Sequence, residues 1–421
     1  MMEMAGRAPM PGGRDARSGD AESGGPLVER TDLRSELAAV APPRCPRCGD
    51  EAPPAADGAC PTCGSPRPVV RDHVELVLGD AAAVTDRGLR RRRNEDAVEL
   101  GRRVEDGVET WVAVVCDGVA SARRGDEASL AAVGAAVGAA LETAAAPATP
   151  PSGFPAISSG DTVSSGDTGP IATVSEDPGE AAEAAEDAAG RAGTGLSGEL
   201  DALATAASAA AATAAADLGR GGGDSPACTY VAAVVRGGDA VVSWIGDSRA
   251  YWLAGDGSSR LLSTDDSWAE EIANAGLMSR EDAARDRRAH VLTRWLGRDA
   301  PSGPAHARRV RLGVPGVLML CSDGLWNHLP DPDVLARLAA PALGGATPGA
   351  AEDGEQHPAL AAALALLSAA LDDGGHDNTT LAIVPIVPPA DSGRPSVAVD
   401  GRGPDERTGP IPLDGEGVVD R

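Results

Sequence analysis

The chain has 421 residues, a formal net charge of −26 at pH 7 and only 2% aromatic residues. Such an acidic surface repels nucleic acid and anionic membranes, which excludes either as the main partner. The 33 Pro and 53 Gly exclude a chain that is packed throughout, so we expect one folded domain with appendages. All 37 basic residues are Arg, which excludes lysine nucleophiles and leaves guanidinium groups to bind phosphate.

The N-terminal segment, residues 1–44, is rich in Gly, Arg, Pro and Glu and shows no periodicity. We expect a disordered lead-in there. The N-terminus lacks a hydrophobic signal core, and no apolar stretch approaches the roughly 20 residues that span a bilayer. These features predict a monomeric protein of the cytoplasm with no membrane partner.

Two CPxCG motifs follow, which pair Cys45 with Cys48 and Cys60 with Cys63. Each motif places two thiolates on a tight turn, where glycine lets the backbone fold beneath a metal. Together they complete a closed four-cysteine site, so residues 45–67 are expected to form a zinc ribbon that holds a structural Zn²⁺. Two disulfides are the alternative, which a reducing compartment disfavours.

From residue 74 to 387, short Val-rich runs alternate with long Ala-rich stretches, which is typical of mixed strands and helices. Two apolar runs joined by RGGD predict a hairpin and therefore antiparallel pairing. The expected strands are HVELVLG, WVAVVCDG, TYVAAVV, AVVSWIG, GVLMLCSDG and TTLAIVPI, and the expected helices cover about 126–146, 198–218, 331–342 and 358–372. Capping boxes at Ser267 with Glu270, and Ser279 with Asp282, predict two more helices in a flap.

Two further segments lack the apolar periodicity of a packed domain. Residues 147–196 contain a duplicated SSGDT and one aromatic residue, Phe154, and we expect a disordered insertion. Residues 388–421 return to Pro, Gly, Asp and Arg, which predicts a mobile tail.

Acidic residues recur at turns along the same domain. They are Asp117, Asp247, Asp323, Asp377 and the pair Glu95 and Asp96. A single Asp-Gly or Asp-Ser pair most often marks only a turn. If the carboxylates converge, however, they repel one another unless hard divalent cations neutralise them. The set predicts a two-metal hydrolase, in which the cations lower the pKa of a water for attack on phosphorus.

The motif order RxxNED, DG, GDSR, SDG and DN, over roughly residues 78–386, resembles the metal-dependent serine/threonine protein phosphatases of type 2C. The resemblance implies an α+β fold, a four-layer α-β-β-α sandwich of two antiparallel sheets over residues 74–387. It also implies hydrolysis of phosphoserine and phosphothreonine in proteins that a Ser/Thr kinase has phosphorylated. Two or three Mn²⁺ or Mg²⁺ ions would serve this reaction.

Carried onto this sequence, the resemblance makes Asp117 the bridging metal ligand. The carbonyl of Gly118 would bind one of the two ions together with Asp117. Asp323 and Asp377 would bind the other ion. Three more carboxylates would complete the site, Glu95 and Asp96 directly or through water and Asp247 with a third ion. The resemblance also makes Arg91 the group that grips the substrate phosphate, a task that suits a planar guanidinium. Asn378 is expected to orient the loop.

The chain departs from the family's DGxGG motif, because residues 117–121 read DGVAS. Because of this departure, one alternative is that the protein is a pseudophosphatase. Its domain would then recognise phosphorylated partners without hydrolysing them. A second alternative is that the main function of the protein is to dock a partner through the zinc ribbon. The acidic segment between its cysteine motifs lacks aromatic residues, which disfavours nucleic acid as its target.

Overall fold

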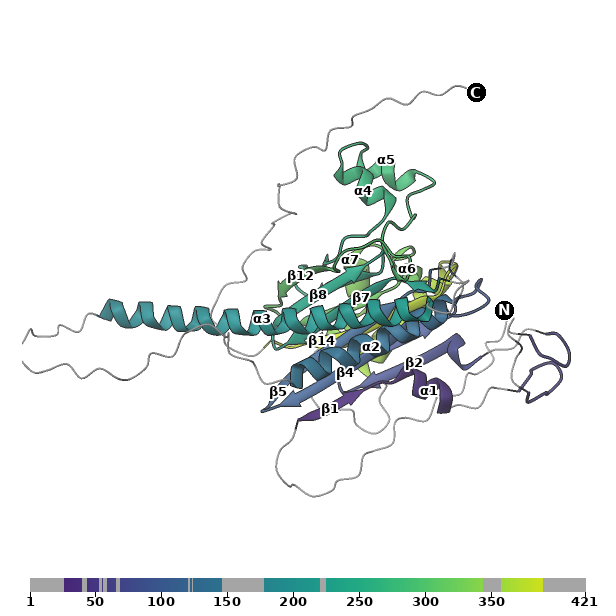
Figure 1. The fold of residues 1–421 in the computed structure, drawn as a ribbon, viewed down its shortest axis with the longest axis horizontal. Coiled ribbons are helices and arrows are strands. Elements are labelled where there is room, and N and C mark those ends of the chain that lie inside the picture. Colours follow the sequence, from purple (N-terminus) through teal and green to yellow (C-terminus); the bar gives the residue numbers. More distant parts are fainter. Residues whose placement is uncertain are drawn as a thin grey trace, which may run out of the picture.

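The computed structural model describes residues 26–39, 44–52, 55, 59–65, 69–119, 122, 124–145, 178–219, 225–343 and 357–388, of which 178–197 and 342–343 by their backbone alone. Two six-stranded antiparallel sheets face each other, and helices cover both outer faces (Figure 1). The predicted α+β sandwich of four layers is confirmed.

The first sheet has the strand order β1-β4-β5-β7-β8-β12. Its strands are β1 (Leu27–Arg30), β4 (Ala97–Glu105), β5 (Val108–Cys116), β7 (Tyr230–Arg236), β8 (Asp239–Ile245) and β12 (His306–Arg311). The strands β7 and β8 form the predicted hairpin, with Tyr230 opposite Ile245. Gly237 turns the chain between them with a φ of 61°, a conformation that glycine adopts without a steric penalty.

The second sheet has the strand order β10-β9-β13-β14-β3-β2. Its strands are β10 (Arg260–Leu261), β9 (Arg249–Ala254), β13 (Gly316–Cys321), β14 (Thr379–Ile386), β3 (Ala81–Asp86) and β2 (His73–Leu78). Every residue of β13 is buried, as expected for a continuous apolar run between a sheet and a helical layer. A separate two-stranded ladder pairs β6 (Ala227–Cys228) with β11 (Leu296–Gly297).

Small side chains let the helices lie close to the sheets. The helices α2 (Gly125–Ala145) and α3 (Pro178–Leu218) cover the first sheet and pack on each other, while α6 (Asp323–Trp326), α7 (Pro332–Leu338), α8 (Ala340–Leu343) and α9 (Pro358–Asp372) cover the second (Figure 1). Buried alanines recur at intervals of four along α2, at 128, 132, 136 and 140, which gives the helix one apolar face.

By length and composition α2 qualifies as a membrane-spanning helix, contrary to the expectation that no stretch would. In the structure it packs against β4, β5 and α3. A helix with one face against a sheet and another against a neighbouring helix is apolar for that reason alone. The composition of α2 is therefore that of a core helix.

The two flap helices are α4 (Trp268–Asn274) and α5 (Arg280–Arg285), which lie away from the four layers (Figure 1). Their predicted caps are confirmed, since the side chain of Ser267 accepts from the Glu270 backbone N and that of Ser279 from the Asp282 backbone N. Gly276 follows α4 with a φ of 69°. A short 3₁₀ helix, η1 (Val70–Asp72), leads into β2.

The prediction of disorder over residues 1–44 is wrong for 27–39, where β1 pairs with β4 at the edge of the first sheet and α1 (Leu33–Ala39) packs against β4 and α2. Thr31 exchanges hydrogen bonds with the backbone of Leu100, and Leu33 is fully buried. The four-residue strand is too short to show a period, and it is held by its pairing with β4. Residues 1–25 and 40–43 lie outside the described residues.

The predicted insertion, residues 147–196, is wrong over 178–196, which belong to α3. This part of the sequence is rich in Ala and Glu, and both residues favour helix. Residues 147–177 lie outside the described part of the chain, as do 389–421 of the predicted tail.

Candidate active-site cleft and metal centres

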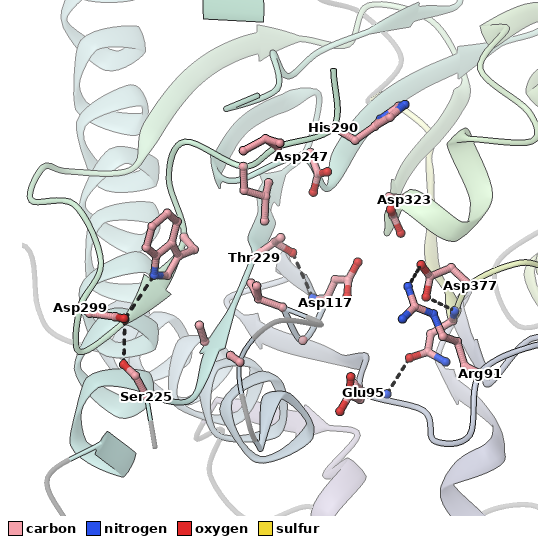
Figure 2. Close-up of a pocket in the computed structure, with 18 residues that line it drawn as sticks. Arg91, Glu95, Asp117, Ser225, Thr229, Asp247, His290, Asp299, Asp323 and Asp377 are labelled. Carbon is pink, nitrogen blue, oxygen red and sulfur yellow. Dashed lines mark hydrogen bonds and ion pairs between the residues drawn. The ribbon is translucent and has the colours of Figure 1, made fainter. Parts of the chain in front are cut away.

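A cleft of about 810 Å³ lies where β5, β8 and β13 end and β14 begins. The predicted site residues that line it are Arg91, Glu95, Asp117, Gly118, Asp247, Asp323 and Asp377. Figure 2 shows the four aspartates among them arranged around the cleft. Asp96 lies beneath it, fully buried, with its carboxyl within hydrogen-bonding reach of Asp117. The structure thus brings together residues that are up to 286 positions apart.

Backbone pairing fixes the loop that carries Asp117. The Asp117 N donates to Thr229 Oγ1 at 3.0 Å, and the Thr229 N donates to the Asp117 carbonyl at 2.8 Å. Two residues later, the Val119 N donates to the Ala227 carbonyl at 2.9 Å. Gly118 thereby forms an isolated antiparallel bridge with Cys228, and the segment DGV runs alongside β6. Thr229 is a site residue that no sequence motif indicated.

Two glycines permit a close contact of three segments beneath the cleft. A Cβ on Gly118 would lie 2.8 Å from the Glu95 carbonyl O and 2.8 Å from the Gly125 carbonyl C. A Cβ on Gly125 would lie 3.0 Å from the Gly118 Cα. The DG loop, the NED segment and the first turn of α2 can therefore touch only because both positions lack side chains. Gly125 was not identified from the sequence.

Buried polar side chains hold the NED segment. The Asn378 Oδ1 accepts from the Glu95 N at 2.8 Å, and its Nδ2 donates to the carbonyls of Arg87 and Arg93. Asn378 thus orients the loop, as expected. Arg71 was not identified, because it belongs to no motif. It donates at 2.8 Å to the carbonyl of Asp96 and also to that of Asn94.

The carboxylates destabilise one another electrostatically. Burial raises the pKa of Asp117 far above its usual range, and the nearby charges of Asp96 and Asp323 raise it further. Burial and the charge of Asp247 likewise raise the pKa of Asp323. Burial raises the pKa of Asp96 to about 6 and that of Asp247 to about 7. The side chains around the site therefore do not supply enough positive charge to keep all of these carboxylates ionised.

This donor set fits hard divalent cations. The Oδ1 atoms of Asp96 and Asp323 are buried and have no hydrogen-bond partner among the described residues. Buried polar atoms seldom lack partners, and carboxylate oxygens are the ligands that Mg²⁺ and Mn²⁺ prefer. Among the described residues, only the four cysteines place all ligand atoms within 4.8 Å of one another. The carboxylates of the cleft form a less compact group than the cysteines.

Arg91 lies at the rim of the cleft with its side chain 40% exposed. Its guanidinium forms an ion pair with Asp377, and this hydrogen bond raises the pKa of Arg91. The predicted phosphate-binding residue is therefore at the cleft and accessible, with a carboxylate as its present partner.

The four cysteines of the predicted ribbon converge. The Sγ atoms of Cys45 and Cys63 are 3.6 Å apart, as are those of Cys48 and Cys60. A tetrahedral ion with Zn–S bonds of about 2.3 Å requires about 3.8 Å between sulfurs, whereas a disulfide requires about 2.05 Å. In each turn a glycine N donates to the first cysteine's carbonyl at 2.8 Å, with φ of 74° at Gly49 and 67° at Gly64. The cluster fits a structural Zn²⁺.

Comparisons with known proteins identify the family. A protein phosphatase 2C family model matches residues 89–364. The chain is 35% identical over 106 residues to the serine/threonine phosphatase stp of Listeria innocua, which is 25% of this chain and 41% of that protein. It is 28% identical over 143 residues to the serine/threonine protein phosphatase PstP of Mycobacterium tuberculosis, which is 34% of this chain and 24% of PstP. The chain thus spans about two fifths, or less, of the length of these relatives.

The chain is also similar to a solved structure. The PPM Ser-Thr phosphatase MsPP from Mycobacterium smegmatis, in complex with cacodylate, aligns with a TM-score of 0.46 and 24% identity. This alignment covers 73% of this chain and 98% of that chain. The family model alone matches well over half of the sequence. The chain therefore belongs to the protein phosphatase 2C family.

Proposed function

We propose that this protein hydrolyses phosphoserine and phosphothreonine in other proteins, with two Mn²⁺ or Mg²⁺ ions held by the cleft carboxylates. The observation that carries the proposal is the set of buried carboxylates with unsatisfied oxygens, which surrounds a cleft that also exposes Arg91. When bound, the divalent cations supply an acidified water and neutralise charge on the phosphoryl group.

The protein side chains divide the remaining work. Asp117 interacts with both Asp96 and Asp323, so it is the carboxylate that two ions could share. Ser322 Oγ donates to Asp96 Oδ2 at 2.8 Å and so fixes the orientation of that carboxylate. Arg91 exchanges Asp377 for the substrate phosphate, which its guanidinium can bind with two parallel hydrogen bonds. The substrate is thereby held in line for attack.

The pseudophosphatase is the less supported alternative. The altered residues of DGVAS begin at Val119, whereas the close backbone contact depends on Gly118 and Gly125, which are both present. All the predicted carboxylate ligands are likewise present around or beneath the cleft. Nothing in the described loop therefore prevents the carboxylates from acting together.

Release of phosphate from phosphoserine and phosphothreonine peptides tests this function. We expect turnover that requires Mn²⁺ or Mg²⁺ and that falls at least about 10³-fold in Asp117→Asn, because a lost central ligand removes most of the electrostatic stabilisation. Glu142→Gln, a charge change on the outer face of α2, is the matched control. Peptide binding without turnover would instead favour the pseudophosphatase.

We further propose that the four cysteines hold Zn²⁺ and that the protein acts in the cytoplasm as a monomer, opposing a Ser/Thr kinase. The sulfur geometry supports the choice of zinc. The requirement for phosphorylated Ser or Thr supports the link to a kinase, since such an enzyme must supply the substrate. No disulfide joins the described cysteines, which agrees with a reducing compartment.

A further inference from the structure

The cleft continues well past the carboxylates. Its lining includes Ser225, Trp295 and Asp299, which hydrogen bonds join to one another. Figure 2 shows Asp299 and Ser225 on the opposite side of the cleft from Arg91 and Asp377. A phosphorylated side chain bound at the carboxylates therefore leaves this side free for a neighbouring part of the substrate.

Asp299 is a carboxylate without a counter-charge on this side of the cleft. Its Oδ1 accepts hydrogen bonds from Ser225 Oγ at 2.7 Å and from Trp295 Nε1 at 3.4 Å, both neutral donors. The Ser225 hydrogen bond lowers the pKa of Asp299, so the group is ionised at neutral pH. No described residue forms an ion pair with it.

The arginines nearest in sequence have other partners. Arg298 donates to the Gly219 carbonyl at 2.5 Å. Arg294 donates to the Pro304 carbonyl at 2.6 Å and forms an ion pair with Asp266. Asp299 is therefore held in place by hydrogen bonds while its negative charge faces the cleft unpaired among the described residues.

The neighbouring wall is apolar. Trp295 is half-buried and lines the cleft with Val291 and Leu292. An indole face attracts a cation, and aliphatic side chains pack against the methylene stem of a long basic residue. A carboxylate beside a tryptophan thus provides both halves of a site for a guanidinium or an ammonium group.

We propose that this side of the cleft binds an Arg or Lys side chain that lies near the phosphorylated residue of the substrate protein. The inference rests on the proposed function, because it places the phosphorylated residue at the carboxylates. An acidic side chain would be repelled by Asp299. A purely apolar side chain would pack on Trp295 and leave the carboxylate unused.

A set of phosphothreonine peptides tests the proposal on the full-length protein with Mn²⁺. Each peptide has one variable position, which is occupied by Arg, Lys, Ala, Leu or Glu. Separate series place this position at each site from three residues before to three residues after the phosphothreonine. We expect Arg and Lys at one of these positions to raise kcat/KM about fivefold over Ala, mainly through KM, as a partly exposed ion pair with a cation–π contact allows.

The preference is measured within each variant as the ratio of kcat/KM for the Arg peptide to that for the Ala peptide. In Asp299→Asn this ratio should fall to within about twofold of unity, because the ion pair is lost. Asp256→Asn is the matched control, since Asp256 also accepts from a serine hydroxyl, Ser258 Oγ at 2.6 Å, but lies in an exposed turn outside the cleft. It should keep the wild-type ratio.

Three outcomes would overturn the inference: equal rates for all peptides, a preference for Glu or Leu, or an Arg preference that Asp299→Asn retains. Trp295→Leu keeps an apolar wall without the indole and should lower the Arg ratio while sparing the Leu peptide. Failure of the proposed function is distinct, because no peptide of the set, including the Ala peptide, would then be hydrolysed.

Discussion

At the scale of single residues, the site combines carboxylates that oppose ionisation with side chains that fix their orientation. The sequence predicted the carboxylates because each lies in a short motif. It did not predict Arg71, Thr229 or Ser322, which hold the motifs in place. Their roles depend on which strands become neighbours. Neither Arg71 and Thr229, which lie outside the motifs, nor the serine of the SDG motif carries a local signal of that.

The first prediction concerns pH and metal. The folded-state pKa of Asp96 is raised to about 6 and that of Asp247 to about 7, so the folded protein retains protons that the unfolded chain releases near pH 4. Without divalent ions, the free energy of unfolding should therefore decrease between about pH 5 and 8, by on the order of 3 kcal/mol.

Urea unfolding at several pH values, with protein freed of Mn²⁺ and Mg²⁺, measures this dependence. Saturating Mn²⁺ should flatten the profile and raise the stability at pH 8, because the ions bind only the folded, ionised site. A metal-free stability that rises from pH 5 to 8 would contradict the assignment of these carboxylates.

The second prediction concerns Ser322, which contacts no substrate. Its Oγ donates to Asp96 Oδ2 at 2.8 Å and accepts from the Thr380 N at 3.0 Å. Ser322→Ala should weaken Mn²⁺ binding about tenfold, as loss of a group that orients a metal ligand commonly does. Ser322→Thr retains the hydroxyl and should restore the affinity. Equal Mn²⁺ affinity in both variants, measured by titration calorimetry, would exclude a positioning role.

At the scale of elements, periodicity predicted the strands β2, β5, β7, β8, β13 and β14, but it missed the interior strands β3, β4 and β9 and began α3 at residue 198 rather than at Pro178. The helix expected over 126–146 is α2 (Gly125–Ala145), and that expected over 358–372 is α9 (Pro358–Asp372). The strand β3 was missed because AAAVTD is rich in alanine, which is uncommon in strands. Its pairing with β2 and β14 on either side determines its conformation. A strand whose conformation is determined by its neighbours in the sheet is difficult to recognise from its own sequence.

The third prediction tests the close contact at the start of α2. Gly118→Ala would force a Cβ to within 2.8 Å of the Glu95 carbonyl O. The shift of the loop should lower kcat at least about tenfold, because catalytic geometry tolerates little displacement. Gly134→Ala in the middle of the same helix is the control. Its Cβ meets nothing closer than 3.6 Å, so it should stabilise the protein by about 1 kcal/mol and keep the activity.

At the scale of the whole molecule, the order of motifs was sufficient to predict the sandwich, through resemblance to a family. Composition alone was not sufficient to predict where the folded domain begins. Residues 27–39 looked like part of a polar lead-in, yet β1 covers the edge of β4, and Arg30 pairs with the buried Glu99. The ribbon, by contrast, was predictable, because four ligands within 19 residues constrain the backbone locally.

The fourth prediction concerns this ribbon. Purified protein should contain one Zn²⁺ per chain by elemental analysis, and the double variant Cys45→Ser, Cys60→Ser should contain none. Hydrolysis of a phosphothreonine peptide should stay within about twofold of wild type, because structural zinc supplies no catalytic group. Loss of hydrolysis together with zinc would show instead that the ribbon supports the phosphatase domain.

The central claim is that the carboxylates around Asp117 hold the divalent ions on which hydrolysis depends. Mn²⁺ bound per chain and phosphate release from a phosphothreonine peptide can be measured on the same samples, by electron paramagnetic resonance and a phosphate assay. We predict at least two bound Mn²⁺, a rate that follows occupancy of the second ion, and loss of both in Asp117→Asn. Hydrolysis that persists without divalent ions, or Mn²⁺ binding that Asp117→Asn leaves unchanged, would contradict the account.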